Sequence, residues 1–163
     1  MRYRMLAALA LFAVVSPAQA QTPALMTSWT IEDMRSVITE QGAKVTESGV
    51  SASGEAYVKG TADTGLHFSV YGAECDSKEV TQHCTGAEMS TSFTIKSGQL
   101  DKALADIDYA AVGYYGSDGD VHVTRYVIFD NGITRENLKV NFRVFLNISG
   151  KIWDMLSTKG YMD

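Results

Sequence analysis

The two cysteines carry the most reactive side chains in this sequence. Cys75 and Cys84 are the only cysteines among the 163 residues. A redox-active pair usually has the closer spacing of a Cys-x-x-Cys motif. A zinc site would need a fourth ligand besides the two thiolates and the neighbouring His83. An even cysteine count is typical of a disulfide in an oxidising compartment, so we predict a structural Cys75–Cys84 bridge and no metal site.

Three histidines are the remaining candidates for catalysis. His67 and His122 fall within expected strands, and His83 falls in the loop between the cysteines. Nucleophile-elbow, zinc-protease and phosphate-loop motifs are absent from the sequence. Asp118-Gly119-Asp120 lacks the other acidic positions of a calcium loop, and a turn explains it better. We expect a non-enzymatic protein without a cofactor; a hydrolase would need His67 or His122 within hydrogen-bond reach of Asp, Ser or Cys.

The N-terminal residues have the pattern of a secretory signal peptide. Arg2 and Arg4 form a positively charged start, residues 5–15 are apolar, and Ala18-Gln19-Ala20 is a small-residue cleavage site. The apolar run is shorter than the roughly 20 residues that span a bilayer. We therefore expect cleavage at this site, no stable membrane anchor afterwards, and a periplasmic location.

The mature chain is long enough for one domain with a hydrophobic core. We predict a flexible lead-in at residues 21–27 and a single domain at residues 28–163. Loss of residues 1–20 removes Arg2 and Arg4 and changes the formal net charge from −5 to −7. No basic patch is present, which argues against nucleic acid as a partner, because nucleic-acid binding depends on neutralising phosphates.

Hydrophobic periodicity predicts helices and strands in the first half of the chain. Helical spacing follows Thr30, a typical N-cap residue, and ends near Gly42. Trp29, directly before the cap, is expected to pack on the first turn as a hydrophobic staple. The pattern then has a period of two residues in four segments, which predict an antiparallel sheet with one buried face: residues 44–47, 56–61, 66–73 and 89–95.

The second half of the chain predicts another helix, a hairpin and a long helix. Residues 99–108 form the second predicted helix, and residues 111–115 and 121–129 form a hairpin around a turn at 116–119. Thr134 then caps the long helix. The predicted order is α-β-β-β-β-α-β-β-α, which is an α+β fold with an antiparallel sheet and helices packed on one face.

The long C-terminal helix carries two apolar faces. On a helical wheel, an arc about 120° wide contains the residues expected to pack on the sheet: Leu138, Phe142, Phe145, Leu146, Ile152, Trp153 and Leu156. A second strip contains Val140, Val144, Ile148 and Met155. Gly150 can mark a bend that rotates Met155 away from this strip. The candidate interface for a protein partner is therefore formed by Val140, Val144 and Ile148.

Tyrosines on the predicted strands form a second candidate surface. Tyr71 and Tyr114 are the candidate binding residues in a group that also contains Tyr57, Tyr115 and Tyr126. A ligand-binding face and the ordinary strand propensity of tyrosine both explain this distribution. If the face binds a ligand, a deep apolar pocket is expected under Tyr71 and Tyr114.

The last strand and the long helix share a residue pattern with a known family. A hydrophobic strand is followed by Asp-x-Gly-Ile-Thr-x-Glu-Asn-Leu and then by Asn-Phe-x-x-Phe; the matching residues are Asp130, Gly132, Ile133, Thr134, Glu136, Asn137, Leu138, Asn141, Phe142 and Phe145. This pattern resembles the YbjN family of bacterial proteins, which are described as sensory transduction regulators. The segment with Tyr71, Gly72, Cys75 and Cys84 also resembles exported members. The resemblance covers residues 28–156 and consists of packing and turn patterns.

The resemblance implies a fold similar to that of type III secretion chaperones, with a curved antiparallel sheet and helices on one side. Proteins of that fold bind other polypeptides and commonly pair through a helix and a sheet surface. We therefore expect an exported binding or regulatory module that recognises a protein partner, which includes the case of a homodimer. The alternative is a domain that senses a small molecule or envelope stress through the concave face of its sheet.

Overall fold

The computed structural model describes residues 24–162, and within them an antiparallel six-stranded sheet is combined with three helices. The chain is therefore an α+β protein, as the hydrophobic periodicity predicts. The predicted signal peptide, residues 1–20, lies outside the described residues. None of the helices in the described part of the chain has the length and apolar character needed to cross a membrane.

Two short strands, one before α1 and one before α3, are additions to the predicted order. The two-residue strands β1 and β8 pair with each other in a small separate sheet. The elements follow in this order: β1 (Leu25–Met26), α1 (Ile31–Glu40), β2 (Lys44–Val50), β3 (Ala56–Thr61), β4 (His67–Cys75), β5 (Cys84–Thr94), α2 (Leu100–Ala105), β6 (Gly113–Ser117), β7 (Asp120–Ile128), β8 (Ile133–Thr134) and α3 (Arg135–Thr158).

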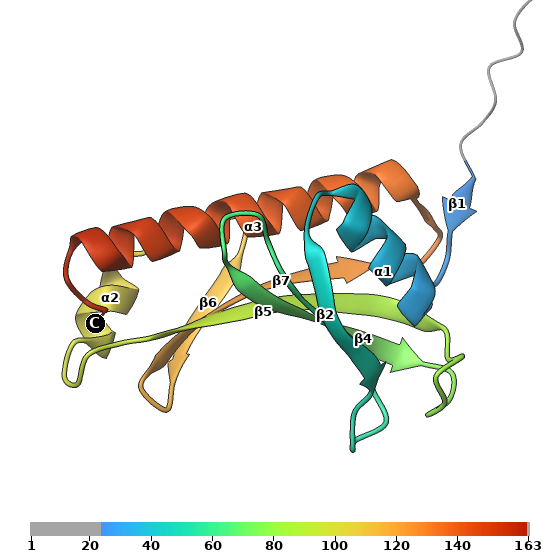
Figure 1. Cartoon of the computed structure of the whole chain (residues 1–163), viewed down its shortest axis with the longest axis horizontal. Helices are drawn as coiled ribbons and strands as arrows, with labels where there is room; N and C mark the ends of the chain where they lie inside the picture. Colours follow the sequence, from blue (N-terminus) through green and yellow to red (C-terminus); the bar gives the residue numbers. More distant parts are fainter. Residues whose placement is uncertain (1–23, 163) are drawn as a thin grey trace, which may run out of the picture.

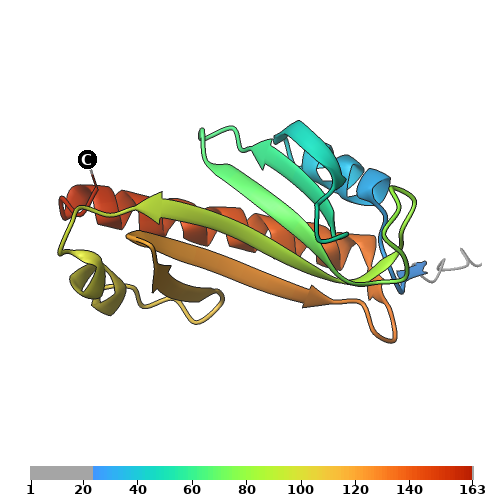
Figure 2. The ribbon, with the colours of Figure 1, turned by 90° about the horizontal axis from the view of Figure 1, so that it is seen from below.

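The six long strands are antiparallel and lie in the order β2-β3-β4-β5-β7-β6. The sheet is curved, and α1 and α3 lie over the same side of it (Figure 1). In the view from below, the strands lie in front of both helices (Figure 2). We call the side of the sheet that carries these helices the helix face, and the opposite side the open face.

The short helix α2 also packs on the helix face, at the end of the sheet formed by β6. Gly116 of β6 pairs with Val121 of β7, which is fully buried. A Cβ atom at Gly116 would lie 3.0 Å from Leu100 and 2.9 Å from Leu104, so these two leucines rest directly on the glycine. All three helices of the described chain therefore cover one face, and the open face is left to solvent.

Local hydrogen bonds begin α1 and α3 where the sequence predicts. The Thr30 side chain accepts the Asp33 N–H at 3.2 Å, and the Asp33 carboxylate accepts the Thr30 N–H at 2.9 Å. The Thr134 side chain accepts the Asn137 N–H at 3.1 Å. These bonds satisfy N–H groups that have no partner inside the helix. Gly42 follows α1 with a φ of 81°.

Several predicted boundaries are wrong. β2 continues to Val50, beyond the predicted range 44–47, and β5 begins at Cys84 instead of residue 89. β6 and β7 are joined by the two-residue turn Asp118-Gly119, with φ values of 53° and 87°, in place of the four-residue turn predicted at 116–119. Two positive φ values fit a type I′ turn, whose twist matches a hairpin and which favours Asp-Gly. The second helix is shorter than predicted and ends at Ala105, and no side chain caps its start at Gln99.

The hydrophobic core lies between the helix face and the helices. α3 contributes the residues of the predicted arc that are fully buried: Leu138, Phe142, Phe145, Ile152 and Leu156. Phe142 meets Phe68 of β4 edge to face, with ring centroids 5.1 Å apart. The prediction that Trp153 belongs to this core is wrong, because its side chain is 46% exposed. Trp153 lies at the margin of the arc, where it lines a cleft beside the sheet.

Ion pairs join α1 to α3. The Glu40 carboxylate lies 2.6 Å from an Arg135 nitrogen and 2.7 Å from Lys139 Nζ. Hydrogen bonds from Arg135, and then from Lys139, lower the pKa of Glu40 from 4.5 to about 2. Because the folded-state pKa is the lower one, these contacts stabilise the fold above pH 4.5, and the stabilisation is lost as the pH falls toward 2.

We expect Glu40→Gln to flatten the acid limb of the stability profile. The free energy of unfolding of the native chain should fall as the pH drops from 4.5 to about 2, and that of the variant should fall less. Urea unfolding at both ends of this range measures the difference. Glu79→Gln is the control, since Glu79 makes no ion pair within residues 24–162. Equal pH dependence in the native chain and in Glu40→Gln would contradict this account.

Candidate functional site

The predicted disulfide is present, with the Sγ atoms of Cys75 and Cys84 2.08 Å apart. It joins the end of β4 to the start of β5. A Cβ atom at Gly72 would lie 2.4 Å from Cys84 Sγ, so only glycine leaves room for the bridge here. This position between two strands gives the bond a structural role. A disulfide is consistent with an oxidising, non-cytoplasmic compartment.

The structure does not bring the three histidines together. His67 Nδ1 lies 3.0 Å from Thr61 Oγ1, and the His122 ring stacks on Tyr115 with centroids 4.9 Å apart. His83 lies in the loop that the disulfide closes. Among residues 24–162, no histidine ring is hydrogen-bonded to a carboxylate, and no group of three His, Cys, Asp or Glu side chains is arranged to hold a metal ion.

The candidate tyrosines lie on opposite faces of the sheet. Tyr71 alternates with buried Val70 and therefore lies on the open face. Tyr114 pairs with Val123, which is buried under the helices. Paired residues of antiparallel strands point to the same face, so Tyr114 lies on the helix face, where its hydroxyl donates to the Ile107 carbonyl at 2.8 Å. The two tyrosines therefore do not line one common pocket, and the role of either as a binding residue stays a prediction.

The candidate interface on α3 is partly exposed. Val140 is 43% exposed, and Val144 is half-buried. Ile148 is also half-buried and packs against the hydrophobic core. The apolar surface that a partner could contact is therefore concentrated at Val140 and Val144, and the role of this strip as an interface stays a prediction.

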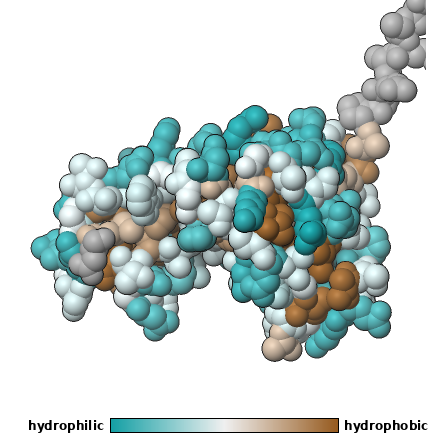
Figure 3. Space-filling model, in the orientation of Figure 1, coloured by the Kyte–Doolittle hydropathy of each residue, from teal (hydrophilic) through white to brown (hydrophobic). Residues whose placement is uncertain are grey.

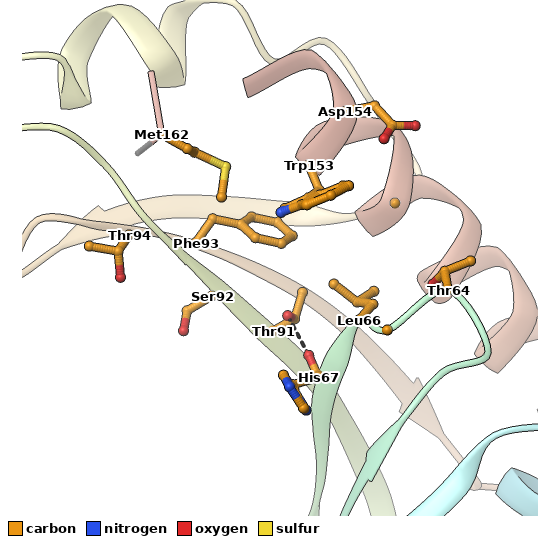
Figure 4. Close-up of a pocket in the computed structure, with 12 residues that line it drawn as sticks. Thr64, Leu66, His67, Thr91, Ser92, Phe93, Thr94, Trp153, Asp154 and Met162 are labelled. Atoms are coloured by element: carbon orange, nitrogen blue, oxygen red, sulfur yellow. Dashed lines mark hydrogen bonds between the residues drawn. The ribbon is translucent and has the colours of Figure 1, made fainter. Parts of the chain in front are cut away.

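A cleft of about 460 Å³ lies between the C-terminal half of α3, the end of β5 and the β3–β4 turn. The Trp153 indole lies beside the ring of Phe93, with Met162 and Leu66 at the two sides of this pair (Figure 4). Apolar surface is visible below the C-terminal half of α3 in the space-filling view (Figure 3). The volume is within the range of ligand-binding pockets, which is about 300–1,000 Å³.

The lining of the cleft is more apolar than polar, and it includes threonine and serine residues and one acidic side chain. Asp154 is the acidic residue among those that line it. Within residues 24–162, the Asp154 carboxylate makes no ion pair. An occupant that combines an apolar group with a cationic group therefore fits the cleft best.

The cleft exists because neighbouring elements end before they cover this part of α3. α1 lies beside the N-terminal half of α3 only (Figure 2). The C-terminal segment then closes one side of the cleft. The Tyr161 carbonyl accepts the Lys96 N–H at 2.8 Å, and the Tyr161 hydroxyl donates to Asp106 at 2.6 Å. These two bonds hold Met162 in the wall of the cleft.

Within residues 24–162, one edge of β5 has no partner strand beside the cleft. The pairing of β4 with β5 ends at Ser69–Ser90, whereas the pairing of β5 with β7 continues to Thr94–Asp120. Residues 91–94 are therefore paired on one side only. The end of β4 is tied to this segment, because the Thr91 hydroxyl donates to the His67 carbonyl at 2.7 Å. An unpaired strand edge is a template for another strand.

Sequence patterns did not reveal this cleft. Phe93 belongs to an alternating strand and Trp153 to the apolar arc of a helix, so both were predicted as core residues. The place where β4 stops beside β5 depends on the register between two strands, which no local pattern specifies. The unpaired edge was therefore visible only after the strands were assembled.

Comparisons with protein-family models, with curated proteins and with solved structures found no match to this chain. The function is therefore inferred from the geometry of the chain itself. The features available for this inference are the cleft with its strand edge, the strip on α3 and the open face.

Proposed function

We propose that this protein is an exported, non-enzymatic binding or regulatory module that recognises a polypeptide partner. We further propose that its domain is YbjN-like, with a fold similar to that of type III secretion chaperones. The helices on one face of a curved antiparallel sheet support this proposal. The disulfide supports export into an oxidising compartment. A regulatory role would then follow from which partner is bound.

The observation that carries the proposal is the cleft between α3 and β5. It combines an apolar cavity with an unpaired strand edge. A polypeptide segment has both an apolar side chain for the cavity and backbone groups for the edge, whereas a small apolar molecule would use the cavity alone. The strip at Val140 and Val144 offers the same partner a second contact on another side of α3.

A depression on the open face favours a second candidate function, the sensing of a small polar molecule. Its volume is about 410 Å³, and Tyr71, His67 and His122 contribute to its lining. Ser69 and Ser90 are paired at its floor on adjacent strands. The underside of the molecule is hollowed between its two ends (Figure 3). Hydroxyl and aromatic groups on a concave surface suit a polar ligand.

A photo-reactive phenylalanine derivative at one of two positions on α3 tests the main proposal. Trp153 lines the cleft and is 46% exposed, and Val140 lies on the strip and is 43% exposed. The two positions therefore have similar exposed fractions and lie on the same helix, α3. We expect irradiation in envelope extract to yield a discrete polypeptide adduct from position 153.

The two positions separate the possible outcomes. Adducts from position 153 that are stronger than those from position 140 support the cleft. Adducts from position 140 alone would contradict binding in the cleft and would show that the partner contacts the strip. An adduct between two copies of this chain would make a homodimer the partner. No polypeptide adduct from either position would contradict a polypeptide-binding function.

A further inference from the structure

We propose that the partner binds as an extended peptide strand that pairs with the free edge of β5 and inserts one apolar side chain into the cleft. This inference rests on the proposed function, because it specifies how the polypeptide is recognised. The occupant is a short extended segment with an apolar residue and, two positions away, a lysine or arginine.

Hydrogen bonds at both ends of β5 identify the backbone groups that are available. The Phe129 N–H donates to the Thr85 carbonyl, and the Ile95 N–H donates to the Gly119 carbonyl, each at 2.9 Å. In an antiparallel strand, successive residues direct their backbone groups to alternate sides. The β5–β7 register is continuous from Gly86 to Thr94, so the odd-numbered residues of β5 are bonded toward β7.

The even-numbered residues of β5 therefore direct their N–H and C=O groups toward β4. Ser90 is still opposite Ser69, but the pairing ends there. Ser92 and Thr94 are the next two residues on this side, and they lie where β4 no longer provides a paired neighbour. At the far end, the Lys96 N–H is bonded to the Tyr161 carbonyl. The window is therefore centred on Ser92 and Thr94, and it is bounded by the His67 carbonyl at Thr91 and by the Tyr161 carbonyl at Lys96.

The pleat of the sheet fixes which ligand side chain enters the cleft. A ligand residue opposite Phe93 points to the same face as Phe93, which is buried on the helix face. Its side chain would enter the cavity lined by Trp153 and Met162. The ligand residues on either side of it would point to the open face, where Ser92 and Thr94 present hydroxyl groups. The expected ligand pattern is therefore polar-apolar-polar.

Charge complementarity adds a second determinant of the ligand. A residue two positions from the apolar anchor points to the helix face again. Asp154 is the acidic residue at the rim of the cleft, and its carboxylate makes no ion pair within residues 24–162. The mature chain is also acidic, with an expected net charge of −7 after loss of Arg2 and Arg4 from the net −5. A lysine or arginine at this ligand position is therefore favoured.

The probes are peptides from a display library of random six-residue sequences. They are selected for binding to the mature protein with its disulfide intact. We expect enriched peptides to combine one large apolar residue with a basic residue two positions away. Methylation of the backbone nitrogens that face β5 should weaken a selected peptide about tenfold or more, because each loses a strand hydrogen bond. Methylation of the alternate nitrogens should have little effect.

Matched variants test the same edge from the protein side. Thr94→Pro removes an N–H that the pairing with β7 does not use, and Thr94→Ala keeps it. We expect Thr94→Pro to weaken binding about tenfold, and Thr94→Ala, which loses the hydroxyl but keeps the backbone N–H, to weaken it much less. Circular dichroism shows whether Thr94→Pro is folded; if it is not, the methylated peptides decide the question on the native chain.

The outcomes distinguish this inference from the proposed function. Peptides that bind in the cleft but tolerate both backbone methylation and Thr94→Pro would overturn strand addition and leave polypeptide binding intact. Enrichment without basic residues, together with unchanged binding in Asp154→Asn, would overturn the role of Asp154. Failure to enrich any peptide, with no adduct at position 153, would overturn both proposals.

Discussion

Replacement of Trp29 by alanine is expected to lower the free energy of unfolding by about 3–5 kcal/mol. The side chain is fully buried, and its indole N–H donates to the Gly86 carbonyl at 2.8 Å. The backbone groups of Trp29 and Cys84 exchange two hydrogen bonds of 2.9 Å. Trp29 therefore connects the segment before α1 to the start of β5 through packing and hydrogen bonds. Truncation of its side chain would leave a cavity between these two segments. Urea unfolding followed by circular dichroism measures the loss.

The second tryptophan provides the matched control. Trp153 is 46% exposed, so Trp153→Ala should change the free energy of unfolding by about 1 kcal/mol or less. Trp29→Phe keeps most of the ring and removes the donor to Gly86, and an intermediate loss of about 1–3 kcal/mol is expected. Equal losses in Trp29→Ala and Trp153→Ala would contradict the anchoring role of Trp29.

Removal of the disulfide is expected to cost about 2.5–3 kcal/mol. The bond joins residues nine apart in the sequence, and in the chain-entropy model a loop of this length restricts the unfolded chain by that amount. Cys84 is also fully buried and its sulfur lies over Gly72, so the double variant Cys75→Ala/Cys84→Ala loses packing as well. Urea unfolding of the oxidised native chain and of the double variant gives the difference.

The reduced native chain separates the bond from the packing of its sulfur atoms. Its stability should lie between those of the oxidised chain and the double variant, because the thiols remain in place. Intact mass with and without reductant reports the state of the cysteines. Two free thiols in mature protein recovered from an oxidising compartment, or equal stability of the oxidised chain and the double variant, would contradict a stabilising bridge.

Local signals in the sequence predicted much of the fold, because their causes are local. Thr30 and Thr134 accept hydrogen bonds from residues three positions later, so the start of each helix depends on a few neighbouring residues. The period-two pattern predicted the strands from the burial of alternate residues. The disulfide was predicted from the even number of cysteines and from the expected oxidising compartment, and the bond is present.

The features that local patterns did not indicate depend on contacts between distant segments. The expected packing of Trp29 on the first turn of α1 stays a prediction, whereas no local pattern indicated its hydrogen bonds to Cys84 and Gly86. Tyr71 and Tyr114 looked equivalent as strand tyrosines, and only the strand register places them on opposite faces. A change of register by one residue reverses the face of every side chain in a strand, so local patterns could not have made this distinction.

The candidate site is the clearest case of this difference. The apolar character of Phe93 and Trp153 was visible in the sequence, but an apolar residue can equally line a core or a cleft. The cleft is produced by the ends of other elements, namely the end of the β4–β5 pairing and the limited reach of α1 along α3. The residues that line the cleft determine neither the end of the β4–β5 pairing nor the part of α3 that α1 covers.

Amide hydrogen exchange with a selected peptide tests the central claim, that an extended polypeptide occupies the cleft along β5, most directly. In the free protein, the Ser92 and Thr94 amides should exchange rapidly, whereas the Thr91 and Phe93 amides are held in the pairing with β7. Addition of the peptide should slow exchange at Ser92 and Thr94 and leave Thr91 and Phe93 unchanged. A peptide that binds without slowing exchange at Ser92 and Thr94, or that protects the α3 strip instead, would contradict the account.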